Sequence, residues 1–294
     1  MEKYYYHCIG GSSHFILINT LIFRMTENKS VIIDTLSHPG ISIVSINRLQ
    51  RKNAVDPVTA KQLYNAILAF EADESQKVCI LTGTGGTFCA GADLHQVALK
   101  KDDNTPGENL QPVQGRNLGP MGPSRLMVQK PVIAAVAGYA VAGGLELSLL
   151  ADLRVVEEDA VFGVFCRRWG VPLIDSGTVR LQAIVGLSRA LDMILTGRPV
   201  GSQEALTMGL ANRVVPKGES LQHALELAKQ IISFPELCMN TDRRSCYYSA
   251  FDASSFEDAM AHEFENGRKV ISKEAIVGAA MFSKGMGRHG SFKL

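Results

Sequence analysis

The chain has 294 residues, of which 46% are hydrophobic and 20% charged, a balance typical of globular proteins. Thirty basic and 29 acidic side chains leave a net charge of +1, so charge gives no reason to expect a nucleic acid or a membrane surface as a partner. No apolar run reaches the ~18–20 residues of a membrane span. The six cysteines are scattered without a Cys-x-x-Cys pair, which argues against a metal site and a disulfide framework.

Residues 1–24 differ in character from the sequence that follows them. They contain an apolar run, Phe15–Phe23, but also Glu2, a single arginine and no clear small-residue cleavage site. We interpret them as a leader or extension of uncertain role, ahead of an alternative start at Met25. The localisation therefore stays open between the cytoplasm and the mitochondrion.

A regular pattern begins at Val31. The β-rich segments 31–35 and 41–46, separated by a turn, predict a hairpin. Asp56 is a good N-cap and Pro57 suits the first position of a helix, so a helix is expected from there. A buried strand is expected over 78–81.

The next elements repeat a strand, a bend and a helix. Residues 88–94 have this pattern, and the polar stretch 99–119 is expected to be a surface loop. Residues 121–130 are predicted to form a short helix that Pro131 ends.

The segment 131–147 carries the clearest chemical signal. A strand, Val132–Val136, leads into the bend Ala142-Gly143-Gly144, and a helix with Glu146 near its start follows. A helix N-terminus offers free N–H groups that favour a negative charge. An anion site beside a carboxylate in apolar surroundings is an arrangement suited to acid–base catalysis.

Further strands and helices alternate as far as Pro216, and only helices are expected after it. The sequence therefore divides into a core over 25–216 and a C-terminal helical region over 217–294. Strands are expected at 152–156, 160–164 and 211–216, and helices at 178–185, 188–195, 203–208, 221–234, 239–251, 255–266 and 272–284.

This pattern resembles the crotonase (enoyl-CoA hydratase/isomerase) superfamily over about residues 31–290. The resemblance is carried, in the family's order, by Phe88-Cys-Ala-Gly-Ala-Asp-Leu94, Gly138–Leu147, Phe162-Gly163, Gly177-Thr-Val-Arg-Leu181 and Leu195-Thr-Gly-Arg-Pro199. It implies an α/β fold, a ClpP/crotonase-like spiral of ββα units with a C-terminal helical trimerisation region, assembled as a homotrimer or hexamer. It also implies an acyl-CoA thioester substrate and no cofactor beyond its coenzyme A moiety.

The resemblance implies roles for particular residues. The N–H groups of Ala92 and Gly143 would stabilise the enolate oxygen of the thioester, and Glu146 would be the acid–base group. The residues that match the family's coenzyme A-binding segments are Arg51, Ala54, Ala90, Asp93, Leu94 and His95.

One position departs from the hydratases, which use a second glutamate to hold water. Cys166 stands there, and a thiol beside a carboxylate is a poor base because its pKa is raised. Asp175 resembles the aspartate of dienoyl-CoA isomerases, or it is the N-cap of the next helix. Trp169 is expected to wall the acyl pocket, and Arg167 and Arg168 to pair with Glu146 or Asp175.

Three hypotheses follow from these residues. The first is a hydratase-like lyase that uses Glu146. The second is an enoyl-CoA or dienoyl-CoA double-bond isomerase that uses Glu146 and Asp175. The third is an acyl-CoA-binding protein that lost hydratase activity with its second glutamate.

Overall fold

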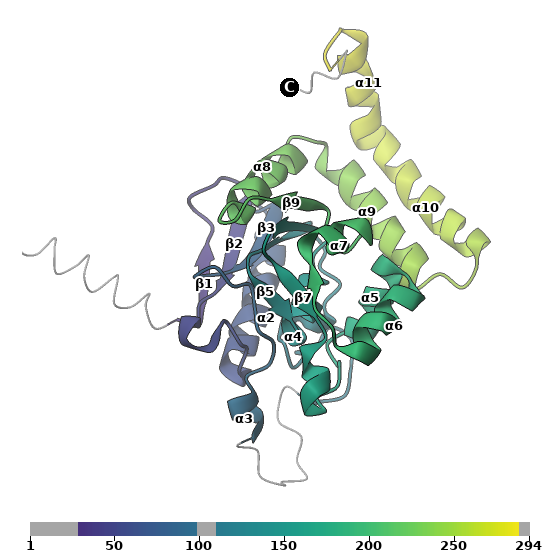
Figure 1. Cartoon of the computed structure of the whole chain (residues 1–294). Helices are drawn as coiled ribbons and strands as arrows, with labels where there is room; N and C mark the ends of the chain where they lie inside the picture. Colours follow the sequence, from purple (N-terminus) through teal and green to yellow (C-terminus); the bar gives the residue numbers. More distant parts are fainter. Residues whose placement is uncertain (1–28, 99–109, 288–294) are drawn as a thin grey trace, which may run out of the picture.

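The computed structural model describes residues 29–98 and 110–287 (Figure 1). The expected leader, 1–24, lies outside the described residues, as do residues 99–109 of the expected surface loop. Within the described ranges, no helix is both long and apolar enough to cross a membrane.

The larger of two sheets has six strands in the order β1-β2-β3-β4-β6-β9. Its first two strands form the predicted antiparallel hairpin, and every other neighbouring pair is parallel. The strands are β1 (Val31–Asp34), β2 (Ile41–Ile46), β3 (Val78–Gly83), β4 (Val132–Val136), β6 (Leu153–Glu157) and β9 (Arg213–Val215).

The smaller sheet contains β5 (Tyr139–Val141), β7 (Val161–Gly163) and β8 (Val200–Gly201). β5 directly follows β4, and β7 directly follows β6. Because β4 pairs with β6 in one sheet while β5 pairs with β7 in the other, each unit adds one strand to each sheet. The chain therefore builds the expected spiral of strand–strand–helix units.

The longest helix of the core begins where the sequence predicted. Asp56 caps it by accepting a hydrogen bond from the Thr59 N–H at 2.8 Å, and Pro57 is its first residue. The core helices are α2 (Pro57–Ala72), α3 (Leu94–Ala98), α4 (Gly143–Ser148), α5 (Gly177–Val185), α6 (Leu187–Thr196) and α7 (Ser202–Thr207), with short 3-10 turns η1 (Leu49–Arg51), η3 (Pro123–Arg125) and η4 (Phe165–Trp169).

The helix predicted over 121–130 is wrong, because only the turn η3 forms there and Leu126 is extended. Two side chains, one just before α5 and one within it, form hydrogen bonds with backbone groups of this segment. Asp175 accepts from the Met121 N–H, and Arg180 donates to the carbonyls of Ser124 and Leu126. Tertiary contacts thus override a helical sequence pattern.

β4 is buried on both faces, and its alternating side chains enter two different cores. Val132, Ala134 and Val136 join the main core, while Ile133 and Ala135 join a smaller one. The helix α8 (Ser220–Ile232) covers the smaller core through Ala224, Leu227 and Ala228. This burial on both sides explains the continuous apolar run that marked the strand in the sequence.

The chain ends in an arm of three helices that extends away from the sheets (Figure 1). α9 (Glu236–Phe251) packs along α10 (Phe256–Val270), which continues through a π-helical turn over 271–275 into α11 (Ile276–Ser283). The two last segments predicted from the sequence are therefore joined. Arg243 and Tyr247 fasten α9 to the core, since each donates to Asp152 at 2.7 Å.

Candidate active site

A cavity of about 450 Å³ lies where α3, α4, η4 and the loop before α5 meet. Its described lining contains no lysine, arginine or histidine. Its titratable members are Asp93, Glu146, Cys166 and Asp175. Much of the remaining wall is apolar and includes Val97, Met121, Phe165, Val171 and Ile174.

The two bends recognised in the sequence lie against each other at this cavity. Cys89 and Ala140 form an isolated parallel bridge rather than a full strand. A Cβ placed on Gly91 would lie 3.1 Å from the Gly143 nitrogen, so the chains touch backbone to backbone. Ala92 and Gly143, predicted as a pair from segments far apart in sequence, are thus brought to one wall.

The N–H groups of Ala92 and Gly143 are available to a ligand. Gly143 is the first residue of α4, so helix geometry supplies no acceptor for its N–H. Among the described residues no hydrogen-bond acceptor is paired with either N–H. Both residues line the cavity, so the two donors are suited to an oxygen bound within it.

The backbone is strained directly before Gly143. Ala142 has φ +53° and ψ −124°, an arrangement that L-residues rarely adopt. Its N–H donates to the Gly163 carbonyl of β7 at 2.8 Å, which ties the bend to the smaller sheet. Strain of this kind persists when the surrounding structure holds it, and it gathers at functional sites.

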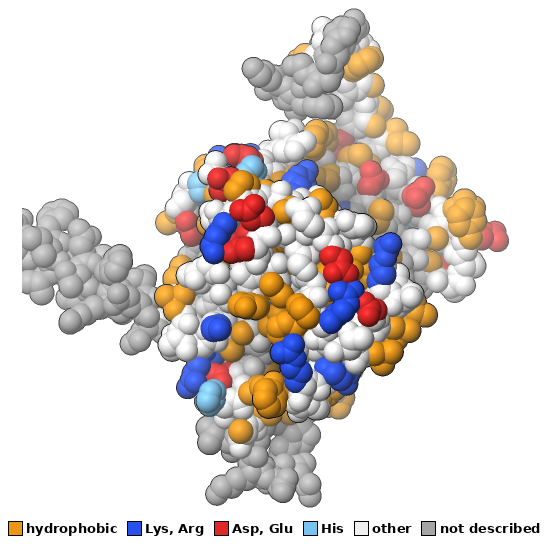
Figure 2. Space-filling view, in the orientation of Figure 1, with side chains coloured by type: hydrophobic (Ala, Val, Ile, Leu, Met, Phe, Trp, Pro, Cys, Tyr) orange, Lys and Arg blue, Asp and Glu red, His pale blue; other side chains and the backbone are white. Residues whose placement is uncertain are grey.

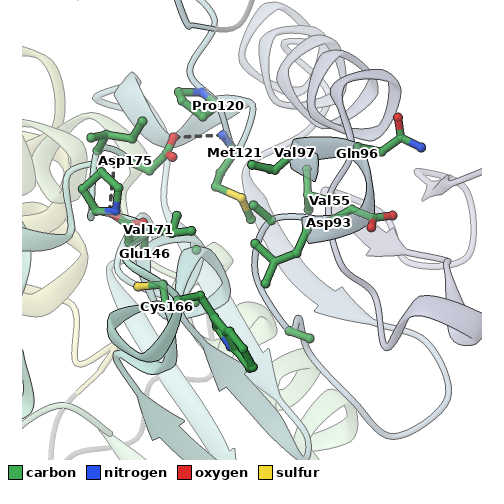
Figure 3. Close-up of a pocket in the computed structure, with 18 of the residues that line it drawn as sticks. Val55, Asp93, Gln96, Val97, Pro120, Met121, Glu146, Cys166, Val171 and Asp175 are labelled. Atoms are coloured by element: carbon green, nitrogen blue, oxygen red, sulfur yellow. Dashed lines mark hydrogen bonds between the residues drawn. The ribbon is translucent and has the colours of Figure 1, made fainter. Parts of the chain in front are cut away.

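Glu146 is buried, with a residual exposure of 3%. Its Oε1 accepts hydrogen bonds from the N–H groups of Asp175 and Gly177, both at 2.9 Å. Within the described residues both of its hydrogen bonds use Oε1, which leaves Oε2 for a ligand. Figure 3 shows Glu146 on the same side of the cavity as Cys166 and Asp175.

Burial raises the pKa of Glu146 to about 8, and the nearby Asp175 carboxylate adds to the increase. The two backbone N–H groups and Arg180 act in the opposite direction. A carboxyl group with a pKa close to neutral pH can both accept and release a proton under ordinary conditions.

Asp175 is also buried at the cavity, but it does not cap α5. The helix begins after Ser176, which has φ +70° and makes no side-chain cap. Asp175 Oδ1 instead accepts from the Met121 N–H at 2.9 Å and from the Ser124 hydroxyl. The N-cap interpretation is therefore wrong. Burial raises the pKa of this carboxyl group, while the bonds from Ser124 and Met121 oppose the increase.

Cys166 lies in η4 and lines the cavity that Glu146 also lines. Burial raises the pKa of its thiol, and Glu146 raises it further, in the direction expected from the sequence. Trp169 ends the same turn and lines the cavity while remaining 71% exposed.

The expected pairing of Arg167 and Arg168 with the buried carboxylates is wrong. Arg167 Nε donates to the Ile194 carbonyl at 3.0 Å, and the Arg168 guanidinium lies 4.4 Å from the centre of the Phe165 ring. Both side chains are exposed. The 3-10 turn η4 directs them outward while it directs Cys166 inward.

The residues expected to bind coenzyme A fall into two groups. Ala90, Asp93 and Leu94 line the cavity. Arg51, Ala54 and His95 are not among its lining residues. Arg51 is exposed at the end of η1 and His95 is exposed on α3. Ala54 is buried in the loop between η1 and α2.

Arg48 organises this side of the site and was missed in the sequence. Its guanidinium is 2.9 Å from Asp56 and 3.0 Å from Asp93, and it donates to the Ala54 carbonyl. Asp93 Oδ1 also accepts from the His95 N–H at 3.1 Å. The only signal for Arg48 was its place in a basic loop, because its partner in the cavity lining, Asp93, is 45 residues away.

A spiral of ββα units that brings two free backbone N–H groups and a buried carboxylate to one cavity defines a crotonase-type site. The family profile for enoyl-CoA hydratase/isomerase matches residues 37–283. The chain belongs to this family.

Similar proteins agree with that assignment. An enoyl-CoA hydratase of Mycobacterium tuberculosis is 37% identical over 210 residues, which cover 69% of this chain and 75% of the relative. A short-chain-enoyl-CoA hydratase of Clostridium acetobutylicum is 36% identical over 66% of this chain and 72% of its own. A crystal structure of an enoyl-CoA hydratase from Mycobacterium tuberculosis superposes with a TM-score of 0.77 at 32% identity, covering 87% of this chain and 96% of that one.

Proposed function

We propose that the protein is an acyl-CoA-transforming enzyme, an enoyl-CoA hydratase-like lyase that adds water across the α,β double bond of an enoyl thioester. One observation carries the proposal. Glu146 and the residues that bear two free N–H groups, Ala92 and Gly143, line the same cavity.

In the proposed reaction the thioester oxygen accepts hydrogen bonds from the Ala92 and Gly143 N–H groups. Ionised Glu146 removes a proton from water while the water oxygen attacks the β-carbon, and the double-bond electrons move towards the thioester oxygen. Glu146 then delivers the same proton to the α-carbon. One donor of this type contributes about 3–4 kcal/mol to the stabilisation of such an oxyanion.

Because Cys166 stands where the hydratases have a second glutamate, only one carboxylate contacts the water in this mechanism. A thiol with a raised pKa stays protonated and is a weak acceptor, so Glu146 alone orients and activates the water. General acid–base catalysis by one positioned group still contributes roughly 10²–10⁴-fold.

The remaining predicted residues complete the substrate site in this proposal. Ala90, Leu94 and Asp93 line the path of the coenzyme A moiety, and Trp169 flanks the acyl chain. Arg51, with the loop that contains Ala54, and His95 lie outside the cavity lining and would meet the phosphate groups. No cofactor beyond the coenzyme A moiety takes part.

A panel of enoyl-CoA thioesters, analysed by product mass, tests the proposal. We expect the wild-type protein to form 3-hydroxyacyl-CoA and the Glu146→Gln variant to lose at least about 100-fold in rate. Unchanged turnover in that variant would contradict the assignment of Glu146. Tight binding of acyl-CoA without any conversion would support a binding protein instead.

An isomerase is the second candidate, because Asp175 places another buried carboxyl group in the cavity. Glu146 would remove a proton from one carbon of the acyl chain, and Asp175 would deliver one to another. Solvent deuterium in the acyl chain, without hydroxyacyl-CoA, would identify this reaction.

We also propose that the helical region 217–294 mediates assembly into a homotrimer or hexamer, with the core 25–216 holding each site. α8 attaches this region to the sheet. Hydrophobic side chains are exposed along α10 and α11 (Figure 2), among them Phe256, Phe264 and Ile276. Several large apolar side chains exposed on one arm are a feature of protein–protein contact surfaces.

A further inference from the structure

Asp175, just before α5, and Arg180 within α5 bind the segment 121–126, whose Met121 lines the cavity. Asp175 Oδ1 accepts from the Met121 N–H at 2.9 Å and from the Ser124 hydroxyl. Arg180 donates to the Ser124 carbonyl at 3.0 Å and to the Leu126 carbonyl at 2.8 Å. The side chains of Asp175 and Arg180 are both buried, so these hydrogen bonds are shielded from water.

Through Met121, this segment contacts the proposed oxyanion site directly. A Cβ built on Gly143 would lie 2.6 Å from the Met121 sulfur and 2.9 Å from two carbons of the same side chain. Met121 therefore packs on the α-carbon of Gly143, the proposed donor. Figure 3 shows the hydrogen bond that the Met121 N–H donates to Asp175.

The same residue supports Glu146 from the other side. The Asp175 N–H donates to Glu146 Oε1 at 2.9 Å, while its carboxylate is directed to the wall. One residue thus contacts both halves of the site through different groups. Because Asp175 Oδ1 accepts two hydrogen bonds from residues 121 and 124, its carboxylate holds this segment in place.

We propose that Asp175 is a positioning residue: its carboxylate seats Met121 against Gly143, and its N–H holds Glu146 beside that same negative charge. The inference rests on the proposed function and assigns to Asp175 a role other than that of a second acid–base group.

The charged and titratable groups around Asp175 support this role. Glu146 and Cys166 line the same cavity as Asp175, Arg180 of α5 lowers the pKa of Glu146, and Arg125 of η3 lowers the pKa of Asp175. The Asp175 carboxylate raises the pKa of Glu146, after the larger effect of burial. Removing this negative charge while keeping the hydrogen bonds should therefore make Glu146 more acidic.

Asp175→Asn is the decisive variant, because the amide oxygen can still accept from Met121 and Ser124. We expect kcat/KM at high pH to stay within several-fold of wild type, and its acidic limb to move to lower pH by about one pH unit. Ser124→Ala is the matched variant that loosens the wall but keeps the charge. It should raise KM and leave the acidic limb in place.

Asp159→Asn removes an exposed carboxylate that pairs with Lys217 and controls for a general change in charge. It should change neither KM nor the acidic limb of the pH profile. Loss of at least about 100-fold in kcat at every pH in Asp175→Asn would overturn the inference and make Asp175 a catalytic residue. An unchanged pH profile would overturn it as well.

Failure of the proposed function can be recognised separately. If the wild-type protein converts no enoyl-CoA, calorimetry with butyryl-CoA and carboxyl-carbon NMR of labelled glutamate replace the kinetic measurements. Weaker butyryl-CoA binding in Ser124→Ala, with a lowered Glu146 pKa in Asp175→Asn, would support the inference. Unchanged values of both would overturn it.

Discussion

Glu146 combines burial with a functional charge, and this combination has a cost in stability that depends on pH. Its pKa in the folded protein, about 8, is above the ordinary value of 4.5. The stability that its protonated form contributes is fully present below about pH 4.5 and is lost as the pH rises through about 8. The contribution of Glu146 to stability is thus smallest where this residue is ionised, the form that the proposed reaction uses.

Glu146→Gln should therefore be inactive but more stable than wild type in alkaline solution. The amide oxygen can accept from the Asp175 and Gly177 N–H groups, and no charge remains to be desolvated. We expect the gain in unfolding free energy to grow by about 1–4 kcal/mol between about pH 5 and pH 9. Urea unfolding at several pH values measures it, and a constant difference would contradict the argument.

Cys166→Glu should increase hydration by restoring a second acceptor for water. The side chain lies in the cavity that Glu146 lines, so a carboxylate there can share the water. We expect crotonyl-CoA hydration to rise by about tenfold or more. Cys166→Gln is the matched control, since it adds similar bulk without a base. Equal rates in the two variants would show that Cys166 does not stand at the water.

At the scale of the residue, the sequence predicted which distant segments meet at one cavity, and the chemical roles of Glu146, Ala92 and Gly143 stay predictions. Glu146, Ala92 and Gly143 were found because each lies in a short motif with its own pattern. The contact of Arg48 with Asp93 and the contacts of Asp175 with residues 121 and 124 were not found, since these partners are 45 and 51–54 residues apart. A side chain in a short motif can be identified locally, but a long-range hydrogen bond has no local signature.

At the scale of the element, two bends pack directly against each other. The bends at 89–92 and 140–144 leave no room for a side chain on the glycines between them. A Cβ on Gly144 would lie 2.0 Å from the Cys89 carbonyl oxygen, which is a severe overlap between backbones. The proposed oxyanion donors are therefore held in place by contact between two main chains.

Gly144→Ala should separate the bends and damage both stability and catalysis. We expect a loss of at least about 2–3 kcal/mol in unfolding free energy and a fall in kcat larger than the change in KM. Gly201→Ala is a suitable control, because a Cβ there meets nothing within 4 Å. Equal stability of the two variants in thermal unfolding would contradict this packing argument.

The turn η4 contributes Phe165, Cys166 and Trp169 to the cavity but neither of its two arginines. It exposes Arg167 and Arg168 and leaves Glu146 and Asp175 as the charged groups of the inner wall. We expect an enoyl-CoA with a terminal carboxylate to have a kcat/KM at least about tenfold below that of an uncharged chain of equal length. Competition between the two substrates, followed by mass spectrometry, measures the ratio. A preference for the carboxylated substrate would contradict the described lining.

Elements with strong periodicity or clear end signals were predicted well, including the hairpin, α2 and β4. The segment 121–130 was predicted wrongly because Asp175 and Arg180 compete for its backbone groups. Such competition arises only after the chain has folded, so a local pattern cannot contain it.

For the whole molecule, the order of the motifs predicted the ββα spiral. The proposed assembly into a trimer or hexamer can be tested on the arm of helices α9 to α11. The arm exposes Phe264 at 67% and Ile271 at 55% of their surfaces. We expect wild type to elute as a trimer or hexamer, and Phe264→Asp with Ile271→Asp to yield smaller species. Light scattering measures the mass, and Glu257→Lys on the same helix serves as a control. A monomeric wild type would contradict the proposed assembly.

The N–H groups that hold Glu146 offer a direct spectroscopic view of its charge. Gly177 donates to Glu146 Oε1 at 2.9 Å, and a hydrogen bond to a carboxylate is stronger than one to a neutral acid. The amide resonance of Gly177 should therefore shift as Glu146 titrates, without any substrate or label on the glutamate. The protonation state of Glu146 can in that way be followed from the backbone of a neighbouring residue.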